Sequence, residues 1–297
     1  MTHRIVGIGE LLWDVLPSGP QLGGATANVA FHAAGLGARA AIVSRVGQDA
    51  LGERAVMTLR RAHVETACVG RDAEAPTGTV SVSVDAAGQP GYAIAEQVAW
   101  DRLVIDADAQ RLVSSADAVC FGTLAQRATT SRHAIQSLVG ETAPAALRVF
   151  DVNLRQHYWT PDVLEQSLVL ANVLKVNEEE LPVLARTFGL EGSVLDQLDT
   201  LMDRWSLWAV ALTRGARGSV LLDVRGAVEH PGLAVTVGDA VGAGDAFTAA
   251  LMLGLLAEWE PTEINARANA VAAAVASQRG AMVPLPDDVR TPFLELS

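Results

Sequence analysis

The sequence lacks several features that mark well-known classes of protein. It has only 2 cysteines among 297 residues, Cys68 and Cys120, which form neither a C-x-x-C pair nor a disulfide framework. Its longest nearly apolar stretch, residues 246–257, is too short to span a bilayer. The first residues lack the basic region and long apolar core of a secretion signal. We therefore expect a cytoplasmic protein that does not bind membranes.

Basic residues are also scarce. The 22 lysine and arginine residues are outnumbered by 34 aspartate and glutamate residues, which gives a net charge of −12, and no run of basic residues occurs. Because such a chain repels phosphate backbones at long range, nucleic acid is disfavoured as a partner. Net charge describes extended surfaces, however, and leaves a small anion-binding site open.

Common nucleotide-binding and catalytic motifs are missing as well. The only lysine, Lys175, follows no glycine-rich loop, which excludes a phosphate loop of the G-x-x-x-x-G-K-[ST] type. Gly7 and Gly9 follow a predicted strand without the third glycine of a dinucleotide site. No G-x-S-x-G nucleophile motif occurs, and the 6 histidines show no metal-ligand spacing.

What the chain does contain is a regular alternation of β-branched runs and helical patterns. Strands are predicted at residues 4–10, 40–47, 117–122, 147–153, 173–177, 207–215 and 218–224. Helices are predicted at residues 25–36, 50–62, 130–140, 161–171, 193–205, 244–259 and 262–279. This alternation favours one α/β domain over residues 1–297, with a mostly parallel sheet in a three-layer α/β/α fold.

One segment departs from this alternation of strands and helices. Residues 77–100 alternate with period two around a turn rich in glycine and proline, which predicts a β-hairpin with no helix beside it. Together with residues 10–22, the hairpin forms either a small accessory sheet or an extension at the edge of the central sheet. The pattern alone does not decide between the two arrangements.

The most informative motif runs from Gly238 to Phe247 and leads directly into an apolar helix. The small residues Gly242, Ala243 and Gly244 let successive backbone N–H groups point into one space at a helix N-terminus, where the dipole favours an anion. Asp245 then has two interpretations. It is either a stabilising acidic residue in a first helical turn or a proton acceptor beside a transferred phosphoryl group.

With the motif GAGD and three further blocks, the chain resembles the ribokinase-like (PfkB) carbohydrate kinases over essentially its whole length, and bacterial fructokinases most. The blocks are GELLWDVLPSGPQLGGATANVAFHAAGLGA, SRVGQDALGERAV, DVNLRQHYW with VLKVNEEEL, and ALTRGARGS with GDAVGAGDAFTAAL. The resemblance implies a Rossmann-like kinase domain with a small β-sheet lid over the sugar. It therefore favours the accessory sheet, with lid strands from about residues 10–22 and 77–100.

The resemblance also implies a role for individual residues. Asp245 matches the catalytic base, and the amides of Gly242, Ala243 and Gly244 match the anion hole. The residues that match sugar-binding positions are Asp14, Gly23, Gly24 and Asn28, and Arg155 is expected to face phosphate or substrate, with Gln126 and Arg127 as secondary candidates. The residues that match nucleotide-binding positions are Asn177 and Glu180 of the N-x-x-E motif, which orders Mg²⁺ and its waters, then Thr213, Gly215, Gly218 and Asn269.

Two positions depart from the family pattern. Ala240 stands where the DTxGAGD signature has threonine, and Thr26 stands where proline is common in GGAPAN. The first departure bears on the packing of the anion hole and on a monovalent-cation site that many relatives build near Asp239. Neither departure removes a group that phosphoryl transfer needs.

These residues predict an ATP- and Mg²⁺-dependent kinase that phosphorylates a primary hydroxyl of a free sugar. D-fructose, giving fructose 6-phosphate, is the favoured substrate, and the segments around Trp13 and Trp100 lean the same way. The alternatives are a 2-keto-3-deoxygluconate kinase or ribokinase, a nucleoside kinase, and a non-catalytic sugar or nucleotide sensor. The resemblance also implies a homodimer formed through the lid.

Overall fold

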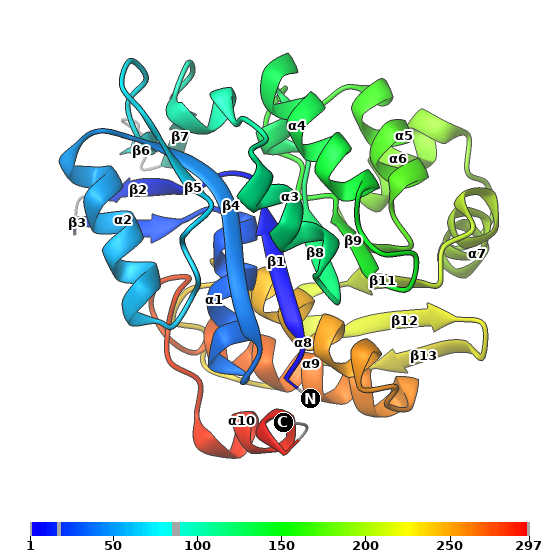
Figure 1. Ribbon diagram of the computed structural model, residues 1–297. Coiled ribbons are helices and arrows are strands. Elements are labelled where there is room, and N and C mark those ends of the chain that lie inside the picture. The colour runs from blue at the N-terminus through cyan, green and yellow to red at the C-terminus, as the bar shows by residue number, and fades with distance from the viewer. Residues whose placement is uncertain (1, 17–18, 85–89, 296–297) are drawn as a thin grey trace.

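The computed structural model describes residues 2–16, 19–84 and 90–295. Its centre is a nine-stranded sheet with the order β13-β12-β11-β10-β9-β8-β1-β4-β5 (Figure 1). In chain order the strands are β1 (Arg4–Ile8), β4 (Arg39–Gly47), β5 (Val69–Asp72), β8 (Ala118–Phe121), β9 (Leu147–Asp151), β10 (Val173–Asn177), β11 (Ala209–Thr213), β12 (Ser219–Asp223) and β13 (Gly226–His230). The pairs β11–β12 and β12–β13 are antiparallel, because β12 runs against the other strands of this sheet. The predicted mostly parallel sheet is confirmed.

Helices cover both faces of this sheet. The first layer contains α1 (Ala25–Gly35), α2 (Ala50–Arg61), α8 (Ala243–Leu256), α9 (Pro261–Ala276) and α10 (Asp287–Leu294). The second contains α3 (Ala107–Ser114), α4 (Thr129–Gly140), α5 (Pro161–Leu170), α6 (Leu181–Phe188) and α7 (Val194–Trp205). Side chains alternate along β1, since Ile5 belongs to the first hydrophobic cluster and Val6 to the second. The three-layer fold is therefore confirmed.

The sequence did not predict the shorter elements. These are β5, β13, α3, α6 and α10, each of eight residues or fewer. A short element offers few positions at which a periodic pattern can be recognised. In β13 the burial pattern lacks a fully buried residue, so the strand has no apolar face that the sequence would reveal.

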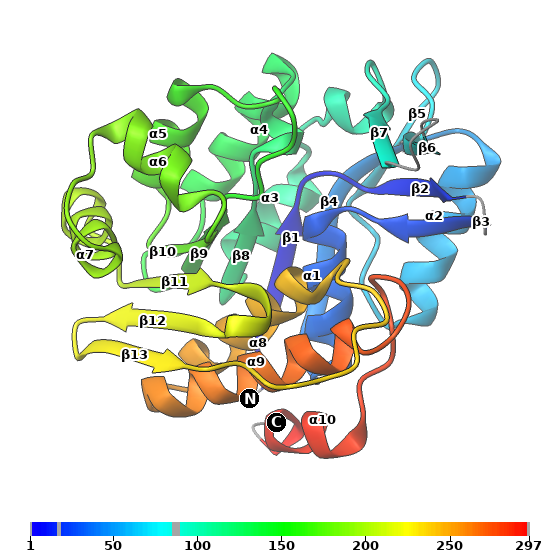
Figure 2. The same cartoon turned by 180° about the vertical axis from the view of Figure 1, so that it is seen from behind.

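A second sheet stands apart from the first. Its order is β3-β2-β6-β7, with β2 (Leu12–Leu16), β3 (Gly19–Gly23), β6 (Gly78–Val84) and β7 (Pro90–Ile94). Figures 1 and 2 show this small sheet at one corner of the molecule, near α2. The accessory sheet is thus correct and the edge extension is wrong. Residues 17–18 and 85–89, which fall within the two predicted lid segments, lie outside the described residues, as do residues 1 and 296–297 of the predicted domain.

Arg127 holds the end of the predicted hairpin segment, residues 77–100, against the rest of the domain. Its guanidinium pairs with Asp101 at 2.8 Å, donates to the Ala95 carbonyl at 2.6 Å, and stacks 4.0 Å from the centre of the Trp100 ring. The neighbouring Gln126 is fully buried and donates to the Gly122 carbonyl. Both secondary candidates therefore have structural contacts in the described part of the chain, and neither side chain is directed at solvent.

Candidate active site

The first turn of α8 presents backbone donors at the carboxyl end of the parallel strands. Gly242 precedes the helix in a left-handed conformation, with φ 79°, and no side chain caps the helix within the described residues. A Cβ at Gly242 would lie 2.7 Å from the Ala281 Cα, so only glycine fits there. The first N–H groups of a helix have no intrahelical acceptor. The Ala243 N–H makes a long hydrogen bond of 3.4 Å to the Ala240 carbonyl, and the turn of residues 242–245 offers its remaining donors and a positive dipole end to an anion.

Two predicted site residues that are far apart in sequence meet at this turn. The Asn28 Nδ2 on α1 donates to the Asp245 Oδ2 on α8 at 2.7 Å. Asn28 is 4% exposed, and its Oδ1 has no hydrogen-bond partner among the described residues. The contact exists because α8 is apolar on nearly every side and packs between α1 and α9. A group predicted to bind sugar is thereby held beside the predicted base.

The environment of Asp245 suits it to accept a proton near neutral pH. Burial and the negative charge of Asp151 raise the pKa of Asp245 from 3.8 to about 6, against the opposing effects of Asn28, Lys175 and Arg155. A carboxylate with such a pKa is ionised at neutral pH and is a stronger base than an ordinary aspartate. This arrangement favours the proton-acceptor interpretation over a simple helix cap.

A buried cluster of charged and polar side chains lies beneath the same turn. Lys175 on β10 pairs with the Asp151 Oδ1 on β9 at 3.0 Å, and the Thr248 hydroxyl on α8 donates to the Asp151 Oδ2 at 2.9 Å. A Cβ on Gly244 would lie 3.2 Å from the Lys175 Nζ, so the glycine lets the helix approach the amine closely. These contacts tie α8 to the ends of two strands and fix the orientation of its first turn.

Glu10 is a further buried carboxyl beside the site. It is 3% exposed, and its Oε1 accepts a hydrogen bond from the Ala25 N–H at the start of α1, at 2.9 Å. Burial raises the pKa of Glu10 to about 7, with backbone hydrogen bonds opposing the rise and the charge of Asp245 adding to it. Glu10 therefore holds the N-terminus of the helix that carries Asn28.

The small sheet contributes Asp14 on β2. A Cβ on Gly23 would lie 2.8 Å from the Asp14 Oδ2, so the glycine leaves room for this carboxylate. Burial raises the pKa of Asp14, while the charge of Arg155 lowers it and that of Asp239 raises it. Arg155 is exposed and acts electrostatically on Asp14, Glu10 and Asp245 alike. The predicted sugar-binding residues thus share one electrostatic environment.

Gly24 shows why the paired glycine is needed. It precedes α1 with φ 110°, and a Cβ there would lie 2.3 Å from the Glu10 carbonyl oxygen. The turn and the close approach therefore both require glycine at this position.

The N-x-x-E residues form a compact turn after β10. The Glu180 carboxylate accepts hydrogen bonds from the Asn177 N–H and the Leu154 N–H, each at 2.9 Å, and is 3% exposed. The Asn177 Oδ1 accepts from the Glu180 N–H at 2.9 Å. Each carboxylate oxygen of Glu180 retains a lone pair for a further donor. The pair therefore fits the ordering of water around Mg²⁺, which keeps several waters in nucleotide sites.

The turn after β11 contains Thr213, Gly215 and Gly218. Gly215 and Gly218 have φ 57° and 78°, and a Cβ on Gly218 would lie 1.9 Å from the His230 carbonyl oxygen. The Thr213 carbonyl accepts from the Glu178 N–H at 3.0 Å, which joins this turn to the N-x-x-E turn. Two predicted nucleotide-binding segments are thus adjacent.

Asn269 and Asp239 have contacts that the sequence does not indicate. The Asn269 Nδ2 donates to the Ser219 Oγ at 2.6 Å and to the Asn265 carbonyl at 2.7 Å, so the amide nitrogen ties α9 to β12. The Asp239 carboxylate accepts from the Val241 N–H at 3.1 Å and closes its own loop. Neighbouring Ala240 is exposed. The base-binding role of Asn269 and the cation site near Asp239 stay predictions.

Sequence reasoning missed Glu10, Asp151 and Thr248. A signal for the first two existed, since Glu10 closely follows β1 and Asp151 ends β9, and parallel strands present their carboxyl ends at one edge. Thr248 gave no signal, because a threonine inside an apolar helix is ordinarily unremarkable. The segments around Trp13 and Trp100 favour a fructokinase on sequence, and in the structure these two side chains are 4% and 1% exposed and lie in the two hydrophobic clusters.

The chain is similar to known proteins over most of its length. The model of the pfkB family carbohydrate kinases matches residues 20–288. The uncharacterized sugar kinase PH1459 of Pyrococcus horikoshii is 31% identical, over 93% of this chain and 91% of its own. Its crystal structure in complex with ATP superposes with a TM-score of 0.83 at 30% identity, covering 98% of this chain and 100% of the other.

Proteins named fructokinase are also similar. The fructokinase of Klebsiella pneumoniae is 29% identical, over 98% of this chain and 99% of its own. The fructokinase of Vibrio cholerae in its fructose-, ADP- and calcium-bound form superposes with a TM-score of 0.82 at 25% identity, covering 99% of each chain. Within the described residues no helix is long and apolar enough to cross a membrane.

Proposed function

The chain belongs to the pfkB family of carbohydrate kinases and is a sugar kinase, and from this premise we propose that it phosphorylates a primary hydroxyl of D-fructose. The observation that carries the transfer chemistry is the contact between Asn28 and Asp245 at the uncapped N-terminus of α8. Support for fructose comes from relatives named fructokinase at about 28–30% identity.

In the proposed reaction, Asp245 orients the sugar hydroxyl and accepts its proton. The hydroxyl oxygen forms a bond to the γ-phosphorus of ATP, the bond to the bridging oxygen of ADP breaks, and ADP leaves with that electron pair. The amides of Gly242, Ala243 and Gly244 donate to the phosphoryl oxygens as charge redistributes. Asp14, Gly23, Gly24, Asn28 and Arg155 position the sugar and the reacting groups.

On the nucleotide side, Asn177 and Glu180 hold water molecules, and Thr213, Gly215, Gly218 and Asn269 line the nucleotide. Bound Mg²⁺ neutralises charge on the phosphates. The small sheet excludes water from the sugar, because water competes as an acceptor of the phosphoryl group.

A substrate panel tests the proposal. ADP release is measured with Mg-ATP and, in turn, fructose, ribose, 2-keto-3-deoxygluconate, glucose and adenosine. We expect the highest kcat/KM with fructose, and phosphorylation at its primary hydroxyl, determined by NMR of the product. Higher kcat/KM on another member of the panel would overturn the choice of fructose. Saturable sugar binding without ADP release on any member would favour a sensor instead.

A further inference from the structure

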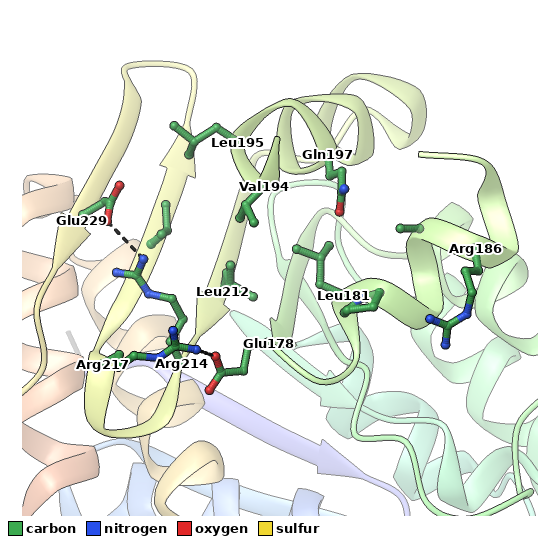
Figure 3. A pocket seen from close by; sticks show the side chains of 13 residues that line it. Glu178, Leu181, Arg186, Val194, Leu195, Gln197, Leu212, Arg214, Arg217 and Glu229 are labelled. Carbon is green, nitrogen blue, oxygen red and sulfur yellow. Dashed lines mark hydrogen bonds and ion pairs between the residues drawn. The ribbon is translucent and has the colours of Figure 1, made fainter. Parts of the chain in front are cut away.

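A pocket of about 620 Å³ lies away from the α8 turn, among α6, α7 and the strands β11–β13 (Figure 3). Its floor includes Leu212 and Val220, which pack in the hydrophobic cluster of the α6 and α7 layer. Their strand neighbours Ala211 and Leu221 face the opposite cluster, which contains α8 and α9. The pocket is therefore on the other face of the large sheet from the first turn of α8.

The walls of the pocket are largely apolar. Figure 3 shows Leu181 from α6, Val194 from α7 and Leu212 from β11 grouped around the same space. Val194 and the adjacent Leu195 are 47% and 39% exposed, although both are aliphatic. A volume of this size is in the range that small-molecule ligands occupy, and such sites combine apolar walls with a few polar groups.

The rim is positive in a chain that is strongly negative. Three arginines line the pocket, Arg186, Arg214 and Arg217, against two glutamates, Glu178 and Glu229, so the local balance is 3 − 2 = +1 while the chain carries −12. Arg214 pairs with Glu229 at 3.1 Å and Arg217 pairs with Glu178. Arg186 has no ion pair with another described residue. The Arg214 Nε is buried without a hydrogen-bond partner among the described residues.

The rim residues also belong to the two turns assigned to the nucleotide. Glu178 lies within the N-x-x-E turn, and its N–H donates to the Thr213 carbonyl at 3.0 Å. Arg214 and Arg217 lie in the following turn, where the Arg214 N–H donates to the Gly218 carbonyl at 2.7 Å. An anion that attracts either arginine away from its glutamate would therefore pull on both turns.

We propose that this pocket binds a small amphipathic anion, with its apolar body between α6, α7 and β11 and its acidic group at the arginine rim. Binding shifts the affinity of the two neighbouring turns for nucleotide, and the nucleotide shifts the affinity for the anion by the same factor. The coupling between the anion and the nucleotide rests on the proposed function. The binding of the anion does not, since the pocket and its charges are independent of the reaction.

Anilinonaphthalene sulfonate is a suitable probe, because it joins an apolar ring system to a single sulfonate and fluoresces when it leaves water. It is titrated into the full chain, into Val194→Asp and into Val224→Asp. Val194 is the first residue of α7, where an acidic side chain is compatible with the helix dipole, so the substitution leaves the fold intact. Val224 is 86% exposed and does not line the pocket, which makes it a matched control.

We expect saturable binding at one site, a dissociation constant at least tenfold higher in Val194→Asp, and no change in Val224→Asp. Arg214→Gln, which removes one rim charge and keeps a polar side chain, should weaken binding about fivefold. Equal binding by Val194→Asp and the control, or fluorescence that does not saturate, would overturn the proposal.

Titration with Mg-ADP separates this pocket from the nucleotide site itself. We expect the dissociation constant of the probe to shift at least twofold and then level off as the nucleotide saturates. A shift that continues to grow with Mg-ADP concentration would mean direct competition, and would assign the pocket to the nucleotide. No shift, with probe binding still lost in Val194→Asp, would refute the coupling and leave the binding site standing. These readouts need no turnover, so they remain valid if the substrate is not fructose.

Discussion

The two sides of the proposed active site are built from different kinds of group. On the proposed sugar side, Asp14 on β2 and Asn28 on α1 contribute polar side-chain atoms beside the glycine pair Gly23 and Gly24. On the proposed phosphate side the polar atoms belong mainly to the backbone of residues 242–245, where the conformation and neighbours of Gly242 exclude a Cβ. Substitution can therefore change the sugar side directly, whereas the phosphate side responds to changes in backbone geometry.

This difference fits the chemistry of the two ligands. Phosphate is the same in every reaction of a kinase, and amides at a helix N-terminus bind it without any particular side chain. Sugars differ in the position and orientation of their hydroxyls, which side chains can distinguish. In the proposed reaction, Asp245 stands where the two sides meet.

The largest effect is expected from Asp245→Asn. Removal of the proton acceptor should lower kcat by a factor of about 10²–10⁴, because general-base catalysis contributes about that much. Asparagine can still accept from the Asn28 amide, so the dissociation constants of sugar and Mg-ATP should change by less than about threefold. Stopped-flow ADP release and isothermal titration calorimetry measure the two quantities. A kcat within tenfold of the parent would show that Asp245 is not the base.

Gly242→Ala tests the backbone side. The new Cβ would meet the Ala281 Cα at 2.7 Å, so the first turn of α8 must move, and kcat should fall by about a hundredfold. Gly189→Ala is the matched control, since Gly189 is also left-handed, with φ 67°, but has open space around it. The control should lose about 1–2 kcal/mol of unfolding free energy and keep its kcat. Equal kcat in the two variants would contradict the crowding argument.

The pH dependence of kcat/KM sharpens the role of Asp245. Its pKa is raised from 3.8 to about 6, and the base works only when ionised, so the rate should fall about tenfold per pH unit below about pH 6. Glu10, with a pKa of about 7, is another buried carboxyl that titrates near this range. The acidic limb should therefore persist in Glu10→Gln. Its disappearance there would assign the titration to Glu10.

The same raised pKa has a consequence for stability. The folded protein binds the proton of Asp245 more tightly than the unfolded chain, so unfolding free energy contributed by this group declines as pH rises from about 4 to about 6. Asp245→Asn should accordingly be more stable than the parent at neutral pH, by about 1–3 kcal/mol, and equal to it near pH 4. Denaturant melts at the two pH values provide the comparison.

A smaller effect is expected from Thr248→Val. The variant keeps the shape of the side chain but loses the 2.9 Å hydrogen bond to Asp151, so α8 is held less firmly above Lys175. We expect kcat to fall about tenfold and stability to fall by about 1–2 kcal/mol. Thr58→Val is the control, because Thr58 bonds only to a carbonyl one helical turn earlier, that of Arg54. A kcat equal to that of the control would make the cluster merely structural.

The smallest effect is expected from Ala240→Thr, which introduces the residue that is usual in the family signature. Ala240 is exposed and its loop is already closed by Asp239, so kcat should change by less than about twofold. A large increase in kcat that depends on added potassium would instead support a monovalent-cation site at this loop.

The comparison also explains which parts of the site were predictable. Asp245, Gly242 and Gly244 follow from a motif contiguous in sequence, since one turn of one helix forms the proposed anion hole. The contact between Asn28 and Asp245 joins positions 217 residues apart, and only the packing of α1 against α8 brings it about. The cluster of Asp151, Lys175 and Thr248 draws one residue from each of three elements. Local sequence patterns contain no information about such contacts between residues that are distant in the chain.

The separate small sheet is a second feature that local sequence patterns predict only in part. Alternation in residues 77–100 predicted strands, but pairing with β2 rather than with the large sheet is a long-range choice. On sequence, Arg127 is a secondary site candidate and the segment around Trp100 favours a fructokinase. In the structure Arg127 pairs with Asp101 and stacks on the Trp100 ring, and these contacts hold the end of that segment in place.

Lys175 has one more consequence, which concerns the reactivity of the chain. It is the only lysine and is 5% exposed beneath α8, so an amine-directed dye or cross-linker finds no accessible lysine side chain on the folded protein. Attachment through lysine side chains of the folded protein is therefore ineffective. The rate at which an amine-directed reagent modifies Lys175, followed by mass spectrometry, instead measures how often α8 moves away from the sheet and exposes this side chain.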